Sequence, residues 1–304
     1  MDTAHIIVPV ADIYREHTFA SEVITQALLY EKVTILDTYG NWSRIEQWDD
    51  YRGWINNFYL DKNSNFDNYS CFTNHSSFLA LFRTIDEKFS NPLFIPQVIP
   101  YGVRVPILER KGDWFKIPFK KFEGDDFSWV NPMIQEKRDN KRYENLYSIM
   151  SKSGLSPNST DDFRDRLIND MFALIGVPYK WGGKSSFGFD CSGLLQSLFK
   201  SNGISMPRDS KDQYERVKNN EISIEESLDG DLLFFGDNGN IEHVAISADY
   251  HCHGNTQFFT HCSGMVKENS LDEEDGLFDK KLMDKFIGIF SVSEIIKEQL
   301  NERK

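Results

Sequence analysis

The sequence predicts an α+β protein in which two small β-barrels precede a unit of helices packed on an antiparallel sheet. Its 304 residues are enough for two or three compact units, at roughly 100–150 residues each. The N-terminal half alternates short runs of β-forming residues with turn residues. The C-terminal half places two amphipathic helical segments ahead of several strands, an order typical of α+β units.

Residues 1–60 are predicted to form the first barrel. The stretch "VTILDTYGNWSRIEQWDDYRGWINNFYL" contains several short β-forming runs. Turns are expected between them at Gly40-Asn41 and at Arg52-Gly53.

Residues 95–135 are predicted to form a second barrel, because they repeat the pattern of the first. "YGVRVPILERKGDWFKIPFK" and "FSWVNPMI" again give an apolar run, a turn, a tryptophan and an alternating strand. Residues 61–94 are expected to connect the barrels, with a helix around "HSSFLALFRTIDEKF".

The polar residues 136–158 are predicted to be a linker, and residues 159–296 the α+β unit. Ser159 or Thr160 can cap its first helix, which Gly176 would end. The apolar face of this helix is formed by Phe163, Leu167, Met171 and Leu174.

A second helix follows in "CSGLLQSLFKSNG", with Gly203 as its stop. "DLLFF", "GDNGN" and "HVAISA" predict a hairpin whose turn is longer than two residues, and "TQFFTHC" predicts a further strand. Residues 271–281 are expected to be a solvated surface segment, and "SVSEIIKEQLNERK" a C-terminal helix. The apolar residues of the second helix are Leu194, Leu195, Leu198 and Phe199.

Composition argues against several functions. The net charge of −13 and pI near 5.0 disfavour a nucleic-acid partner, which usually requires a basic face. No stretch reaches the ~18 apolar residues of a membrane span.

The first residues do not resemble a signal peptide. If the chain is complete, the protein is expected in the cytoplasm; if a leader was removed, it is expected outside the cytoplasm. The four cysteines include no C-x-x-C pair and are expected to be free thiols.

Cys191 stands between a glycine-rich loop and the start of the second helix. Unpaired N–H groups at a helix N-terminus stabilise a thiolate and lower its pKa below the free value of about 8.5. The same N–H groups can form an oxyanion hole for acyl transfer. A buried cysteine acting as a small hydrophobic residue explains the position equally well.

A cysteine nucleophile needs a base, usually histidine, that a third polar group orients. His243 begins the "HVAIS" strand, and His261 lies on the next strand. Strand alternation places Gln257, Phe259 and His261 on one face. Each histidine taken alone is more simply explained as an ordinary imidazole.

In combination, these motifs resemble the NlpC/P60 cell-wall peptidases. "GVPYKWGGKSSFGFDCSGLLQSLF" is followed in order by "MPRDSKDQ", "DGDLLFFG", "EHVAIS" and "THCSG", covering about residues 160–290. The two barrels resemble the bacterial SH3-like domains of the family branch that contains γ-D-glutamyl-L-diamino acid endopeptidases. "DDYRGW" and "SEVITQALLYEKVTIL" are similar to first-barrel segments of that branch. The resemblance implies a papain-like catalytic fold.

The resemblance also implies roles for individual residues. Cys191 would be the nucleophile, His243 the general base and His261 the residue that orients it. Tyr179 would place its hydroxyl near the thiol. Further substrate contacts would come from Asp190, Ser192 and Ser210 in the catalytic unit and from Tyr51 and Glu22 in the first barrel.

The implied substrate is a peptidoglycan stem peptide, L-Ala-γ-D-Glu-L-diamino acid, cut at the γ-D-Glu carbonyl. Tyr51 and Glu22 would bind the free amine of L-Ala, with Asp190 adding negative charge; both barrel residues are otherwise explained as ordinary surface residues. Wall recycling follows if the protein is cytoplasmic. No cofactor is predicted.

Three alternatives remain open. A structural zinc could use the ligand types in "HCHGNTQFFTHC", although their spacing matches no standard zinc finger. The barrels could serve a module that binds wall peptide or glycan, with a degenerate catalytic unit. An acyltransferase or amidase could use the same papain-like framework. The zinc-ligand types in this stretch are His251, Cys252, His253, His261 and Cys262.

Overall fold

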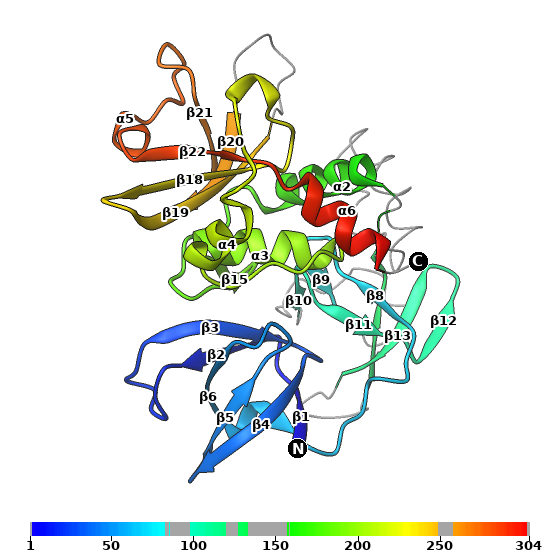
Figure 1. Cartoon of the computed structure of the whole chain (residues 1–304). Helices are drawn as coiled ribbons and strands as arrows, with labels where there is room; N and C mark the ends of the chain where they lie inside the picture. Colours follow the sequence, from blue (N-terminus) through cyan, green and yellow to red (C-terminus); the bar gives the residue numbers. More distant parts are fainter. Residues whose placement is uncertain are drawn as a thin grey trace. The chain divides into compact units, whose positions relative to one another are not determined.

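The computed structural model describes residues 2–82, 85, 98–119, 127–132, 157, 159–248 and 258–302 (Figure 1). The chain divides into two compact units, Met1–Leu155 and Ser156–Lys304. The predicted linker at 136–158 lies almost wholly outside the described residues.

The first unit begins with a seven-stranded sheet in the order β3-β2-β6-β5-β4-β1-β7. Its inward side chains, among them Ile6, Ile13, Ile45 and Ile55, are fully buried and form one apolar core. The β-rich prediction for residues 1–60 is confirmed. The elements are β1 (Asp2–Ile6), β2 (Val10–Tyr14), β3 (Val23–Leu28), β4 (Lys32–Tyr39), β5 (Trp42–Glu46), β6 (Arg52–Asn56), a 3-10 turn (Asn57–Tyr59) and β7 (Leu60–Asp61).

The two predicted turns of this sheet have different outcomes. Gly40-Asn41 does join β4 to β5, but Arg52-Gly53 lies inside β6. Gly53 serves close packing instead of turning, because a Cβ there would lie 2.5 Å from the Ile13 side chain. The chain turns just before, where Asp50 has a positive φ of 62°.

A second group of strands packs around a core that includes Phe72, Leu79, Val105 and Ile117 and that also takes in Leu28, Leu29 and Tyr30, at and just after the end of β3. Here β8 pairs with β11 and β9 with β10, so the predicted connector 61–94 contributes strands to this region. The helix expected around residues 75–89 is wrong at Phe78–Ala80, which is β9; much of the rest lies outside the described residues. The strands are β8 (Cys71–Thr73), β9 (Phe78–Ala80), β10 (Val98–Pro100), β11 (Arg104–Pro106), β12 (Glu109–Lys111), β13 (Trp114–Pro118) and β14 (Phe127–Val130).

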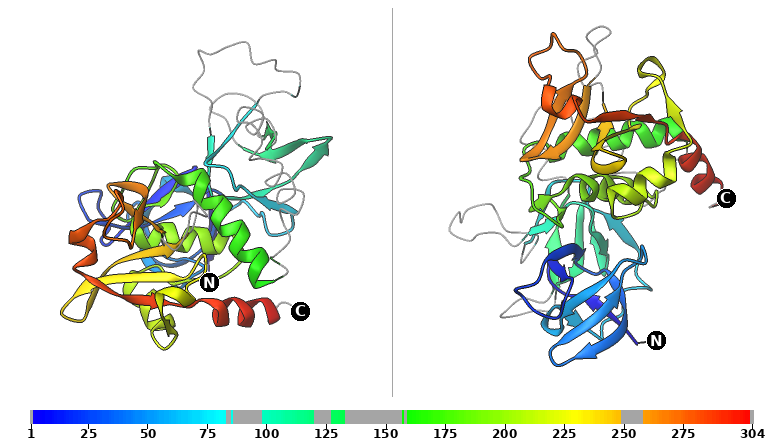
Figure 2. Two further views of the ribbon diagram at one scale, coloured as in Figure 1. Left: turned by 90° about the horizontal axis from the view of Figure 1, so that it is seen from above. Right: turned by 60° about the vertical axis from the view of Figure 1, so that its left-hand side comes forward.

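The second unit is built on a six-stranded antiparallel sheet in the order β17-β22-β18-β19-β20-β21. Helix α3 packs on β19 and β20, α4 packs on β19, and α2 packs on α3 (Figures 1 and 2). The α+β prediction is confirmed. The strands are β15 (Lys184–Ser185), β16 (Gly188–Phe189), β17 (Glu221–Ile222), β18 (Leu232–Asp237), β19 (Asn240–Ser247), β20 (Phe258–Ser263), β21 (Met265–Ser270) and β22 (Phe286–Phe290). The helices are α2 (Thr160–Leu174), α3 (Cys191–Ser201), α4 (Ser210–Val217), a 3-10 turn (Ile224–Glu226), α5 (Lys280–Met283) and α6 (Ser293–Asn301).

The two helices of the sequence pattern form as predicted. Ser159 caps α2 by accepting the Asp162 N–H at 3.1 Å, and Gly176 follows the helix with a φ of 87°. The helix α3 ends just before Gly203. The apolar positions predicted on both helices are all buried: Phe163, Leu167, Met171, Leu174, Leu194, Leu195, Leu198 and Phe199.

The β18–β19 hairpin is tighter than predicted. Asp237 pairs with Asn240, so the loop has only two residues, Asn238-Gly239, and both have positive φ. This is the Asn-Gly loop that matches the twist of paired strands. The register then shifts between Phe235 and Gly236. This bulge lies directly beside His243, and bulges commonly re-aim a neighbouring side chain.

Within the described part of the chain, no helix is both long enough and apolar enough to cross a bilayer.

The start of α3 lies tightly against the preceding glycine loop. A Cβ at Gly193 would overlap the Gly183 carbonyl oxygen and approach Asp190 Oδ1 to 2.8 Å. The same Gly183 carbonyl accepts the Asp190 N–H at 3.0 Å. The helix start can therefore hold its position only with glycine at residue 193.

We expect Gly193→Ala to lower the free energy of unfolding of the second unit by about 1–3 kcal/mol, the cost of overpacking against backbone atoms. The measurement is a urea titration followed by hydrogen exchange of α3 peptides. Gly276→Ala is the control, since a Cβ there meets nothing within 4 Å. Equal unfolding free energies for the two variants would contradict the packing argument.

Candidate active site

Cys191 is the first residue of α3 and is half-buried. Asp190 caps the helix, accepting the Gly193 N–H on Oδ1 at 2.6 Å. The backbone N–H groups of Val244 and Ser192 lie against the Cys191 sulfur and favour its thiolate form. The thiol therefore faces strand β19 at the residue that follows His243.

An opening of the sheet exposes this part of β19 to the helix. Among the described residues, the β19–β20 ladder pairs only Ile246 with Thr260 and Ser247 with Phe259. Beyond Ile246, toward His243, the two backbones no longer pair. The amide of Val244 is thus available to the Cys191 thiol.

Three side chains form a hydrogen-bonded chain across this opening. His243 Nε2 lies 2.7 Å from His261 Nδ1, and His261 Nε2 lies 2.8 Å from Asn269 Oδ1. His261 and Asn269 are buried, whereas His243 is only half-buried. The rings of Phe235 and Phe259 pack beside the two imidazoles. The histidine that meets solvent is therefore the one that precedes Val244, whose N–H lies against the Cys191 sulfur.

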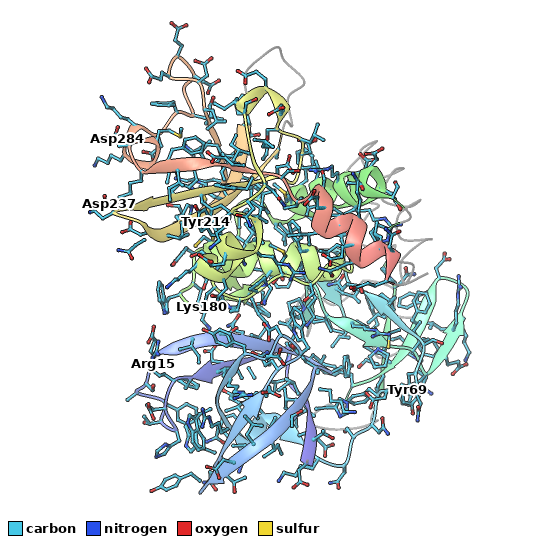
Figure 3. All side chains as sticks on the ribbon, in the orientation of Figure 1. Arg15, Tyr69, Lys180, Tyr214, Asp237 and Asp284 are labelled. Carbon is cyan, nitrogen blue, oxygen red and sulfur yellow. The ribbon has the colours of Figure 1, made fainter. Side chains whose placement is uncertain are left out.

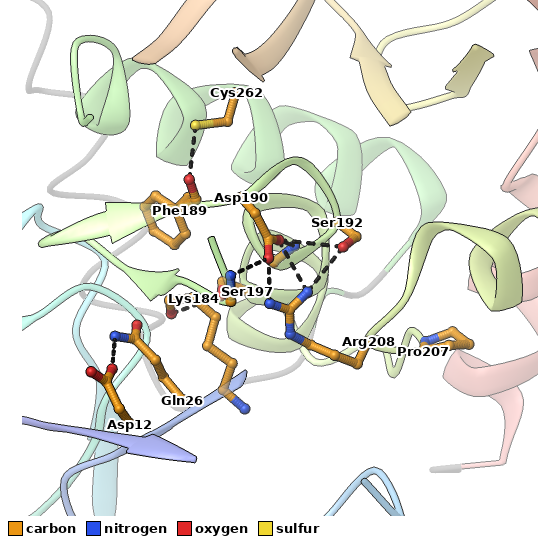
Figure 4. Close-up of polar contacts among 12 residues, drawn as sticks. Asp12, Gln26, Lys184, Phe189, Asp190, Ser192, Ser197, Pro207, Arg208 and Cys262 are labelled. Atoms are coloured by element: carbon orange, nitrogen blue, oxygen red, sulfur yellow. Dashed lines mark hydrogen bonds and ion pairs between the residues drawn. The ribbon is translucent and has the colours of Figure 1, made fainter. Parts of the chain in front are cut away.

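A buried ion pair anchors the start of α3 (Figure 4). Arg208 donates to both oxygens of Asp190, at 3.0 Å and 2.6 Å, and to the Ser192 hydroxyl at 2.9 Å. Gly182 N–H donates to Asp190 Oδ2 at 3.0 Å. Both carboxylate oxygens are engaged, which argues against the predicted contribution of Asp190 to ammonium binding. Gln213 Nε2 adds a bond to the Ser192 carbonyl at 3.1 Å.

The expectation of a lowered thiol pKa at Cys191 is wrong. Burial raises the pKa of this thiol to about 11, and the Asp190 carboxylate raises it further. The N–H groups of Val244 and Ser192 and the Arg208 guanidinium act in the opposite direction but do not outweigh burial. The resting side chain is therefore a protonated thiol at neutral pH.

The two histidines are also neutral in the resting site. Burial lowers the pKa of His243 to about 3, with further lowering by His261 and Lys267. Burial lowers the pKa of His261 to about 4; Lys267 lowers it too, while Asn269 and Asp279 raise it. A neutral imidazole has a free ring nitrogen that can accept a proton, which is the form that a general base requires.

Tyr179 lies within electrostatic reach of Cys191. Burial raises the pKa of its hydroxyl to about 12, and Cys191 in its ionised form and the Asp190 carboxylate add to the rise. The hydroxyl therefore stays protonated as a donor, and 37% of the residue is exposed. Ser210 is the half-buried first residue of α4. Its substrate contact, like that of Ser192, stays a prediction.

The two barrel residues lie together within the first unit. Arg15, labelled in Figure 3, donates from Nε to Glu22 at 2.8 Å and lies within electrostatic reach of Tyr51. Glu22 is exposed and Tyr51 half-buried. The sequence did not predict Arg15, which gives the Glu22 carboxylate a cationic partner.

The zinc alternative falls partly outside the described residues, as His251, Cys252 and His253 do. His261 is engaged by His243 and Asn269, and the Cys262 thiol donates to the Phe189 carbonyl at 3.1 Å. Over the ranges that the structure covers, no group of three metal-ligand side chains is present. Cys71, Cys191 and Cys262 are free thiols, as predicted.

Sequence reasoning missed Arg208 and Asn269. The sequence signal for Arg208 is that it is the only basic residue in "MPR", the segment that follows the second helix. Asn269 was visible through strand pairing: His261 pairs with Lys267 across β20–β21, so Asn269, two residues on, returns to the same face.

Each of the two units matches a known protein family. Residues 176–284 match the NlpC/P60 family, and residues 9–61 match the bacterial SH3 domain family. The chain resembles a gamma-D-glutamyl-L-lysine dipeptidyl-peptidase of Bacillus cereus, with 28% identity over 244 residues, 75% of this chain and 66% of that protein. It resembles a protein of the same name from Bacillus subtilis, with 28% identity over 238 residues, 73% of this chain and 68% of that protein. This chain thus spans about two thirds of these relatives.

A solved structure gives the same result for the fold. The crystal structure of an NlpC/P60 family protein from Bacillus cereus superposes with a TM-score of 0.69, covering 94% of this chain and 98% of that chain at 21% identity. The predicted fold, an SH3-like β-region before a papain-like α+β unit, is confirmed.

Replacing Arg208 with Met should destabilise the second unit by about 3–5 kcal/mol, because Asp190 would remain buried without its partner. The double variant Asp190→Asn/Arg208→Met should lose less than the sum of the single variants, since no charge is left unpaired. A double-mutant cycle from urea unfolding measures this coupling. Arg216→Met, on the exposed side of α4, is the matched control. Strict additivity would show that the ion pair does not anchor the helix.

We also expect alkylation of Cys191 by iodoacetamide to accelerate continuously between pH 6 and pH 9. The thiol pKa of about 11 leaves the thiolate fraction still rising over this range. Mass spectrometry of the Cys191 peptide measures the rate, with Cys191→Ala as the blank. A rate that levels off by pH 7 would instead indicate a preformed thiolate–imidazolium pair.

Proposed function

Because this chain carries an NlpC/P60 domain at residues 176–284 and a bacterial SH3 domain at residues 9–61, we propose that it is a cysteine endopeptidase of peptidoglycan stem peptides. Its bond would be the one between γ-D-Glu and the diamino acid, in peptides with a free N-terminal L-Ala. NlpC/P60 domains are generally cysteine peptidases acting on peptidoglycan. The proposal rests on the contact between the Cys191 thiol and the backbone N–H of Val244, the residue that follows His243.

The reaction would proceed by general-base activation of a neutral thiol. His243 takes the Cys191 proton while the sulfur attacks the γ-glutamyl carbonyl carbon, giving a tetrahedral oxyanion. Collapse of this intermediate breaks the C–N bond, and His243 returns the proton to the leaving amine. Water, deprotonated by His243, then hydrolyses the thioester and releases the dipeptide and the free thiol.

The start of α3 supplies donors for the developing oxyanion. The N–H of Gly193 is bound to the Asp190 side chain and that of Leu194 to the Asp190 carbonyl. The preceding amides, at Cys191 and Ser192, lie at the helix start, where N–H groups point out of the helix. The protonated hydroxyl of Tyr179, within electrostatic reach of Cys191, would be a further donor.

Recognition of the free amine is assigned to Glu22 and Tyr51 of the first barrel. The support is their common position around Arg15 and the names of the two Bacillus relatives, which describe dipeptidyl-peptidases. An ammonium group would share the Glu22 carboxylate with Arg15, since that carboxylate is exposed. A cytoplasmic location and a role in wall recycling stay predictions of the sequence.

The test uses the peptide L-Ala-γ-D-Glu-L-diamino acid, with meso-diaminopimelate or L-Lys at the third position, and its N-acetylated form. We expect release of L-Ala-D-Glu from the free peptide, and loss of more than about 1,000-fold in kcat/KM for Cys191→Ala, as nucleophile removal costs in related triads. Cys71→Ala, a thiol of the first unit, is the control and should keep full activity. Mass spectrometry follows the products.

The outcomes separate the parts of the proposal. Equal cleavage of the acetylated peptide would keep the peptidase and remove the amine-binding role of Glu22 and Tyr51. No cleavage of either peptide would overturn the proposal and favour a binding module or an acyltransferase on the same framework.

A further inference from the structure

We propose that Asn269 is a positioning residue that sets the proton positions on both histidines and thereby makes His243 a base toward Cys191. The inference rests on the proposed function for its catalytic meaning, but its geometry does not depend on the substrate. The observation behind it is the unbroken hydrogen-bond chain that runs from the Leu277 carbonyl to His243.

The direction of hydrogen bonding is fixed at the Leu277 end of this series. Asn269 Nδ2 lies 2.5 Å from the Leu277 carbonyl oxygen, which can only accept a hydrogen bond. The amide nitrogen of Asn269 must therefore be the atom facing Leu277. Its oxygen Oδ1 then faces His261 Nε2, and it too can only accept. The orientation of this side-chain amide follows from the backbone of the loop before α5.

The proton positions on the histidines follow from this end. His261 Nε2 must carry a proton to donate to Asn269 Oδ1, so in the neutral ring its Nδ1 is a bare acceptor. His243 Nε2 lies 2.7 Å from that atom and must donate to it. The remaining nitrogen of His243, Nδ1, is then unprotonated and can accept the Cys191 proton. The opposite arrangement would place a proton on Nδ1 of His243 and disable the base.

Two charged groups also face the His261 ring. Lys267 is its cross-strand partner on β21 and disfavours a second proton, whereas Asp279, just before α5, favours one. His243 is the third titratable neighbour. The hydrogen bonds require a neutral His261, and burial and Lys267 favour that same neutral form.

The choice of variant depends on an open cavity of about 400 Å³ that reaches Asn269. Its lining includes Lys267, Leu277 and Asp279. In Asn269→Ala, water from this cavity could accept the His261 proton and conceal the effect. Asn269→Leu fills the same volume without an acceptor, and Asn269→Asp keeps the acceptor while losing the donor to Leu277. Ser270→Ala is the matched control, a buried hydroxyl on the same strand that accepts the Asp272 N–H.

The first experiment needs neither a variant nor a peptide. Nitrogen-15 NMR of histidine-labelled protein at pH 7 should show His243 and His261 both protonated at Nε2 and bare at Nδ1. A His261 protonated at Nδ1 would overturn the inference. Failure of the peptide to be cleaved would overturn the proposed function and leave this result standing.

The variants test the consequence for Cys191. Asn269→Leu should slow alkylation of Cys191 at pH 7 by about 10- to 100-fold, the loss typical of removing an outer hydrogen-bond partner of a functional histidine. Asn269→Asp should retain more of the rate than Asn269→Leu. In Asn269→Asp, the fall of the alkylation rate toward low pH should begin at a higher pH, because the carboxylate favours a doubly protonated His261. An alkylation rate in Asn269→Leu within twofold of Ser270→Ala would overturn the inference. If Asn269→Leu does not fold, the direction of the shift in Asn269→Asp decides: no upward shift contradicts it.

Discussion

The site depends on one buried carboxylate, that of Asp190. It caps α3, holds the amide of Gly182 and pairs with Arg208 through both oxygens. An isolated carboxylate at 7% exposure would be strongly unfavourable, so the guanidinium and the two amides together make its burial possible. Because Gly193 allows the helix to touch the Gly183 carbonyl, the glycine loop and the start of α3 form one rigid body that carries the Cys191 sulfur.

The same carboxylate limits how the cysteine can react. Helix starts favour thiolates, but here burial and the neighbouring Asp190 charge outweigh the N–H groups, and the thiol stays protonated. Burial also keeps His243 neutral. In the proposed reaction, two neutral partners would make proton transfer coincide with attack on the substrate instead of preceding it. A protonated resting thiol is a weaker nucleophile than a thiolate, so Cys191 is expected to react slowly with stray electrophiles.

The local pattern of the sequence was enough to predict most of the second unit. Periodicity and capping placed α2, α3 and β20, with Cys191 at a helix start and His243 and His261 on strands, because each depends on neighbours within a few positions. Gly53 was misassigned, since a glycine required by a side chain thirty or more residues away looks like a turn glycine. Arg208 and Asn269 were missed because their roles exist only after helix and hairpin bring distant residues together. The thiol pKa was mispredicted for a related reason: burial is a property of the whole fold.

The loop at residues 271–281 shows how a segment without chemistry of its own can matter to the site. Its charged residues predict a solvated surface, and most of its side chains are indeed exposed. Its backbone nevertheless supplies the Leu277 carbonyl that orients Asn269, and the Leu277 N–H is itself held by Asp275 at 2.7 Å. A main-chain carbonyl has one protonation state and can only accept a hydrogen bond, whereas a side chain such as that of serine can also donate one. The direction of every hydrogen bond from Asn269 to His243 can therefore be traced to a carbonyl that cannot reverse it.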